Sequence, residues 1–233
     1  EDGLRAGGGD LLGHDDSKSL NTLDTLVEEN GVKYVKHYLI DFGASLGSAS
    51  HGPNSPRSGG DYLFQWGPAV RQFVTLGFAV PEWARAKYPG IPSVGAFEYK
   101  VFDPERWVPE YPNPAFSNMD ANDAFWAARQ VMAFTDDEIR AVAGAGEYSD
   151  ARAEEWVVRC LIERRDKIGR AFFAQVLPLD RFAVRNGELT FEDLSSTYFD
   201  MEQTYSVQWY SFDNRTGVRS RIEGATSFDV PAS

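Results

Sequence analysis

Five polar side chains near the start of the sequence have the types and spacing that phosphoryl transfer requires. In the stretch HDDSKSLN, His14 is followed by Asp16, Lys18 and Asn21, and Asp41 closes a later apolar run. Transfer of a phosphoryl group needs a carboxylate that orients the attacking hydroxyl, oxygen ligands for Mg²⁺ and a cation on the transferred group. Asp16 suits the first role and Lys18 the last, while Asn21 and Asp41 supply oxygen ligands. The pattern therefore predicts a site for magnesium and a nucleotide phosphate.

A β-hairpin is the element expected to position these side chains. Residues 22 to 42 contain the β-like run TLDTLV, the turn EENG and the longer run VKYVKHYLIDF, and the pair Asn30-Gly31 is typical of a two-residue turn. Because the two strands of a hairpin run antiparallel, its open end would bring Asn21 and Asp41 together. The next stretch, SLGSASHGPNSPRSGG, is rich in Ser, Gly and Pro and predicts a long loop, functional or mobile.

HDDSKSLN and HYLIDFGASLG together resemble the catalytic core of the protein-kinase-like superfamily, over residues 14–47. The second half, IDFG followed by LG, is more similar to the phosphoinositide 3/4-kinases and other atypical branches than to ordinary Ser/Thr kinases. KHYLIDFGASLGS and ERRDKIGRAFF also look like stretches of uncharacterised bacterial proteins. The kinase resemblance implies ATP and Mg²⁺ as cofactors, with His14 as a support for the loop. It further implies these site residues: Asp16 and Lys18 as catalytic, Lys18, Asn21, Asp41 and Gly43 as cofactor-binding, and Asn21 and Asp41 as metal ligands.

Other parts of the kinase pattern are missing from the sequence. It has no Gly-rich phosphate loop and no strand lysine of the VAIK type, and Val80-Pro81-Glu82 is a poor substitute for APE. GGGD at 7 to 10 lacks the preceding strand and the following GK[ST], so it is not a P-loop. The expected activity is therefore an ATP- and Mg²⁺-dependent phosphotransferase of kinase-like type, truncated or degenerate, whose acceptor the sequence does not identify.

Two other functions stay open. A non-catalytic binding module would use the kinase-like scaffold or the aromatic residues between 62 and 126 to hold a partner protein or a cell-envelope component. A metal-dependent hydrolase would use His14 and Asp16, with His37 or His51 as a third ligand of zinc or iron. No GxSxG motif is present to favour a serine nucleophile.

The motif residues also have ordinary structural readings. Asp15 and Asp16 are typical of helix N-caps and turns. Asn21 could be a turn amide, and Asp41 could bond the backbone of its own loop.

The composition is that of a folded, acidic protein. The chain has 233 residues, 42% of them hydrophobic, and a formal net charge of −12. This charge argues against nucleic acid or an anionic membrane as the main partner, because phosphate binding needs clustered Lys and Arg. Cys160 is the only cysteine, which excludes an intrachain disulfide, and its apolar surroundings predict a buried structural thiol. The sequence contains no run of ~18 apolar residues, the length needed to span a bilayer.

The predicted fold class is α+β, in two parts. Residues 1–177 are expected to form a fragment of a kinase-like C-terminal lobe, with a β-hairpin followed by helices, and residues 178–233 a small β-rich unit. The sequence has no initiator Met and no signal peptide, and its Gly-rich start runs directly into the motif. We therefore expect a product that lacks its upstream half, along with any targeting signal, which leaves the compartment open.

Three helices are predicted in the second half of the first part. NDAFWAARQVMAF and TDDEIRAVAGAG have helical patterns, and the second contains a Thr135-x-x-Glu138 capping box and stops at Gly144. SDARAEEWVVRCLIERRDKIGRAFFAQVL predicts a long helix that is capped by Ser149 and exposes the charged run 163–166. Its expected buried stripe comprises Trp156, Val157, Cys160, Leu161, Ile168 and Phe172.

The remaining segments are predicted from aromatic and turn residues. Residues 61 to 117 are rich in aromatics and Pro, and we expect short helices and extended pieces packed by Trp and Tyr. RFAVRNGELTFEDL predicts a hairpin on Asn186-Gly187. TYSVQWYSFDNRTG alternates polar and apolar residues like a strand before another turn.

Overall fold

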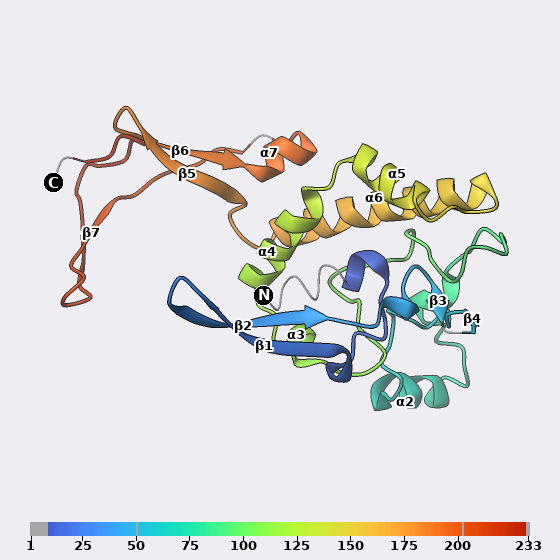
Figure 1. The fold of residues 1–233 in the computed structure, drawn as a ribbon. Coiled ribbons are helices and arrows are strands. Elements are labelled where there is room, and N and C mark those ends of the chain that lie inside the picture. The colour runs from blue at the N-terminus through green and yellow to red at the C-terminus, as the bar shows by residue number, and fades with distance from the viewer. Residues whose placement is uncertain (1–8, 50, 202, 232–233) are drawn as a thin grey trace. The chain divides into compact units, whose positions relative to one another are not determined.

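The computed structural model combines helices with small antiparallel sheets and describes residues 9–49, 51–201 and 203–231 (Figure 1). This confirms the α+β class. The chain divides into two units, Glu1–Val176 and Leu177–Ser233, each of which is described by itself. Of the Gly-rich start, residues 1–8 lie outside the described part, and residues 9–12 are helical. In the part of the chain that the structure describes, no helix has both the length and the apolar character needed to cross a membrane.

The predicted hairpin is present and leads directly from the first motif to the second. Strands β1 (Thr22–Glu29) and β2 (Val32–Leu39) pair antiparallel from Thr22↔Leu39 to Glu29↔Val32. The turn residues Asn30 and Gly31 both have positive φ, 52° and 79°, as a two-residue turn that matches the strand twist requires. The choice of Asn-Gly at this point therefore sets the register of the whole hairpin.

The three predicted helices are α4 (Ala121–Met132), α5 (Asp136–Gly144) and α6 (Ala151–Phe173), and both α4 and α5 pack against α6 (Figure 1). In α5 the capping box of Thr135 and Glu138 is confirmed. The predicted cap of α6 is wrong by one residue, because the carboxylate of Asp150, not Ser149, accepts the backbone N–H of Arg152.

The buried face of α6 forms the centre of the first unit. Of the predicted stripe, Trp156 is half-buried and the other members are buried: Val157, Cys160, Leu161, Ile168 and Phe172. Phe97 and Ile139 join them in the core. The prediction that the run 163–166 is exposed holds for Glu163 but is wrong for Arg164 and Arg165, which are 5% and 9% exposed. Both guanidinium groups donate to backbone carbonyls, and these hydrogen bonds offset part of the desolvation cost of burying a charge.

One short element, η1 (Ser19–Asn21), precedes the hairpin. After the hairpin come η2 (Phe42–Ala44) and, within the predicted loop, the two-residue strands β3 (Ser48–Ala49) and β4 (Gly52–Pro53). Residues 61 to 117 contain short helices, as predicted: α2 (Trp66–Val74), η3 (Glu82–Arg85) and α3 (Pro114–Ser117).

Two indole rings fix the loop that follows β4. A Cβ on Gly59 would lie 2.3 Å from the ring nitrogen of Trp107, and one on Gly60 would lie 2.6 Å from the ring of Trp83. The backbone can therefore pass these rings only where there is no side chain. The prediction that aromatics pack this segment fails for Trp66, which is 77% exposed on α2.

The second unit is built from two hairpins and one short helix. Strands β5 (Leu179–Arg185) and β6 (Glu188–Asp193) pair around Asn186-Gly187 as predicted, and α7 (Leu194–Phe199) follows. The strand predicted from TYSVQWYSF is reduced to β7 (Tyr210–Phe212), which pairs with β8 (Arg219–Arg221).

Candidate functional site

Asp16, Lys18 and Asn21 meet in one short loop. The side-chain amide of Asn21 donates to the backbone oxygen of Asp16 at 2.8 Å and to its Oδ2 at 2.9 Å. Lys18 Nζ lies 2.6 Å from Asp16 Oδ1. This hydrogen bond raises the pKa of Lys18, so the ammonium remains charged beside the carboxylate. Both N–H groups of the Asn21 amide are thus used, and Oδ1 is the atom of this side chain that a cation would take.

Asp41 lies at the open end of the hairpin, next to the residue that pairs with Asn21. The backbone N–H of Ile40 donates to the Asn21 oxygen at 2.9 Å, which continues the strand pairing by one step. Asp41 itself has φ 61° and ψ 64°, a left-handed conformation that costs energy for a residue other than glycine. Its carboxylate does not cap η2, so the ordinary reading as a loop-bonding residue finds no support there. Gly43 is close by, since a Cβ on it would lie 3.5 Å from Asp41 Oδ1.

His14 connects the two motifs through a ring contact. Its imidazole is fully buried and stacks on Phe42, the residue after Asp41, with ring centroids 5.1 Å apart. Neither ring nitrogen has a hydrogen-bond partner within the described residues. The Ser17 hydroxyl donates to the His14 carbonyl and tightens the turn. His14 therefore packs between the two motifs through its ring and tightens the first one through its carbonyl.

Residues 110 to 113 bond to this loop, a contact that the sequence analysis missed. The Glu110 N–H donates to the Asp15 carbonyl at 2.6 Å, and the Asn113 amide donates to the Ser17 carbonyl at 2.7 Å. Lys18 Nζ also lies 5.9 Å from the centre of the Tyr111 ring. These hydrogen bonds join residues that are far apart in the chain, so no local sequence pattern predicts them.

Arg164 is a second residue that sequence reasoning missed. Its guanidinium donates to the Asp10 carbonyl and, at 3.2 Å, to the Glu98 carbonyl, while its centre lies 3.9 Å from the ring centre of Phe102. Burial lowers the pKa of Arg164 to about 10, and burial also raises the pKa of Asp10. At neutral pH Arg164 is therefore still a cation, and it connects α6 to the segment that precedes the motif.

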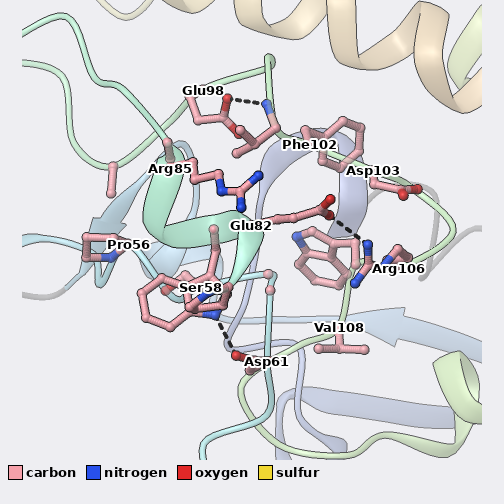
Figure 2. Close-up of a pocket in the computed structure, with 18 of the residues that line it drawn as sticks. Pro56, Ser58, Asp61, Glu82, Arg85, Glu98, Phe102, Asp103, Arg106 and Val108 are labelled. Atoms are coloured by element: carbon pink, nitrogen blue, oxygen red, sulfur yellow. Dashed lines mark hydrogen bonds and ion pairs between the residues drawn. The ribbon is translucent and has the colours of Figure 1, made fainter. Parts of the chain in front are cut away.

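A cavity of about 800 Å³ lies beside this segment, within the first unit (Figure 2). Gly13 and Gly47, which flank the two motifs, are part of its wall, and Arg164 is too. The rest of the wall comes from the loop after β4, from α2 and η3, and from residues 96–108. Figure 2 shows Glu82 paired with Arg106, and Glu98 accepting the backbone N–H of Val101.

The histidines of the predicted metal site are not gathered around one point. His37 Nδ1 lies 2.6 Å from Asp24 Oδ1, its cross-strand partner on the hairpin. Across residues 9–49, 51–201 and 203–231, no group of three or more His, Cys, Asp or Glu side chains is arranged to hold a metal ion.

Cys160 is fully buried, as predicted, and burial raises the pKa of its thiol to about 12. The thiolate that nucleophilic catalysis requires is therefore not accessible at neutral pH.

No family model, curated protein or solved structure matches the chain.

Proposed function

We propose that the first unit carries a kinase-like site for Mg²⁺-dependent phosphoryl transfer from ATP. The observation that supports it is the double attachment of Asn21. Its side chain is bonded to Asp16, and its backbone is bonded to Ile40, next to Asp41. A single residue thus bonds to the carboxylate suited to a base and to the chain neighbour of the carboxylate suited to a metal.

The donor set fits magnesium. Asn21 Oδ1 and the Asp41 carboxylate are hard oxygen ligands of the kind that Mg²⁺ prefers, with substrate phosphates and water filling the other positions. These two residues would hold the ion, whose chemistry is to neutralise phosphate charge.

Asp16 and Lys18 would act on the reacting groups. Asp16 is held by Asn21 on one oxygen and by Lys18 on the other, which fixes the direction of its carboxylate. It would accept the proton of the attacking hydroxyl as the acceptor oxygen bonds to the γ-phosphorus and the bond to ADP breaks. Lys18 would loosen its ion pair with Asp16 and neutralise charge on the transferred group.

A thermal-shift titration with ATP, with and without Mg²⁺, tests the proposal. A ligand at ~100 times its Kd adds about 2.7 kcal/mol of stability, which shows as a rise of several degrees in Tm. Asp41→Asn should remove the Mg²⁺-dependent shift without lowering the Tm of the protein alone. Asp137→Asn, a change on the exposed surface of α5, is the matched control and should keep the shift.

The same experiment separates the enzyme from the non-catalytic alternative. A binding module on the same scaffold would show an intact melting transition and no response to Mg²⁺ and ATP. If Asp41→Asn responds as strongly as the parent, Asp41 is not a metal ligand and the proposed site is wrong.

A further inference from the structure

The 800 Å³ cavity adjoins a second hollow of about 590 Å³, and the two share one wall. Residues of η3 and of the segment 101–103 line both, and Arg85 belongs to this shared wall. Figure 2 shows the Arg85 side chain extending from η3 into the first hollow, between Glu98 and Glu82. The combined space is large enough for a metabolite-sized ligand, since such pockets measure about 300–1,000 Å³.

The walls of the two hollows carry an excess of positive charge in an acidic chain. Each hollow has four cationic side chains in its wall, and Arg85 is common to both, so seven cations face this space. Four carboxylates accompany them. The whole chain carries −12, so this region has the opposite sign from the rest of the molecule. The cations are Arg71, Arg85, Lys100, Arg106, Arg164, Lys167 and Arg170.

The carboxylates of the wall already have donors. Asp61 accepts the indole N–H of Trp83, and Glu98 accepts the backbone N–H of Val101 at 2.9 Å. Glu82 is paired with Arg106 at 2.7 Å, and Asp103 accepts the N–H of Glu105 at 3.0 Å. Each carboxylate of the wall therefore accepts at least one hydrogen bond or ion pair from the protein itself.

Two of the cations donate to neutral groups. Lys167 Nζ donates to the carbonyls of Tyr99, Lys100 and Phe102. Arg164 also donates to carbonyls, and its charge interacts with the nearby Asp10 and Glu98 carboxyl groups. Among the described residues, the Arg71 and Arg85 side chains have no hydrogen-bond or ion-pair partner. Both arginines are exposed, so their guanidinium groups are open to an anion that enters the hollow from solution.

We propose that the shared hollow binds a small molecule that carries a phosphate monoester, with Arg85 and Arg71 as its anion ligands. A guanidinium presents a planar fork of N–H donors that fits phosphate, and a dianion gains more than a carboxylate from several cations. Trp83, Phe102 and Trp107 also line the space and provide apolar surface for the organic part of the molecule.

This site is distinct from the proposed magnesium site. Asn21 and Asp41 line neither hollow. Binding at the hollow depends on arginine, so it requires no Mg²⁺ and is independent of the phosphotransfer proposal. Asp41→Asn, which should abolish Mg²⁺-dependent ATP binding, should leave binding at the hollow unchanged.

Calorimetric titration of the whole chain with phenyl phosphate, at constant ionic strength and without Mg²⁺, tests the inference. Arg85→Gln should weaken binding roughly tenfold to a hundredfold, because a charge-assisted hydrogen bond is lost. Arg71→Gln should weaken it in the same direction. Lys87→Gln, which removes a nearby cation outside both hollows, is the matched control and should bind like the parent.

Benzoate, which carries the same ring on a carboxylate, should bind more weakly than phenyl phosphate. The inference is overturned if the parent does not bind phenyl phosphate at millimolar concentration, or if Arg85→Gln binds as well as the parent. Equal binding of benzoate would overturn the phosphate class. Loss of binding in Asp41→Asn would place the ligand at the other site and would also overturn the inference. Circular dichroism of each variant confirms that its fold is intact.

Discussion

At the scale of single residues, the Asn21 amide determines where the Asp16 carboxylate lies. Asn21 is 8% exposed, and its side-chain amide donates both of its N–H groups to Asp16. An amide is the only side-chain group of this size that can donate twice and still present an oxygen to a cation. A carboxylate at the same position could present oxygen but could not donate.

Asn21→Asp should therefore destabilise the protein although it conserves shape. The substitution removes both hydrogen bonds and places a second carboxylate about 3 Å from Asp16 Oδ2, a contact that disfavours ionisation of one of them. We expect a loss of about 2–3 kcal/mol in the free energy of unfolding at pH 7, measured by urea denaturation. Asn118→Asp, at an exposed asparagine after α3, should change it by less than about 0.5 kcal/mol. Equal stability of the two variants would mean that the Asn21 bonds do not hold the loop.

At the scale of elements, α6 does more than contribute a buried face. Arg164 connects this helix to the Asp10 and Glu98 carbonyls, which are 154 and 66 residues away in sequence. Arg164→Lys keeps the charge, but one ammonium cannot reach both carbonyls in the arginine geometry. We expect a loss of about 2–3 kcal/mol in stability by urea denaturation. Arg159→Lys, on the exposed side of the same helix, should be nearly neutral, and equal losses would rule out the specific connection.

The start of α5 should respond to acid. Hydrogen bonds from the Thr135 backbone N–H and hydroxyl lower the pKa of Glu138 below its usual value of 4.5. A carboxyl whose folded pKa is lowered stabilises the fold above its unfolded pKa, and this contribution is lost as pH falls through the folded pKa. Glu138→Gln should therefore have a lower urea midpoint than the parent at pH 6, and the two should converge near pH 3. A constant difference across this range would exclude an ionised Glu138 from the cap.

These elements also show which features a sequence reveals. The hairpin and the cap of α5 could be predicted because each depends on residues that are neighbours in the chain, Asn30 with Gly31 and Thr135 with Glu138. The spacing of the motif residues likewise placed Asp16, Lys18 and Asn21 in one loop. Arg164 could not be identified, because a charged run on a helix looks exposed until the carbonyls that bury it are known. The arginines of the hollow come from separate segments, and only folding gathers them.

At the scale of the whole molecule, the two units differ greatly in the core that supports them. Among the described residues of Leu177–Ser233, Leu194 is the only large apolar side chain less than 9% exposed. The unit instead relies on an aromatic cluster in which Phe191 contacts three rings, at centroid distances of 5.9 Å to Phe182, 5.4 Å to Tyr205 and 5.6 Å to Phe228. A domain this small gains little from burial, so one ring carries a large share of its stability.

Phe191→Ala should therefore unfold the second unit and leave the first one folded. Truncation of a packed phenylalanine costs roughly 3 kcal/mol, which is most of what such a unit has to lose. Hydrogen exchange should show loss of amide protection in β5 and β6, with protection retained in α4 and α6. Phe182→Ala, at a ring that is 60% exposed, should reduce protection much less. If α6 loses protection together with β5 and β6, the two units unfold as one, and both candidate sites of the first unit depend on the second for their stability.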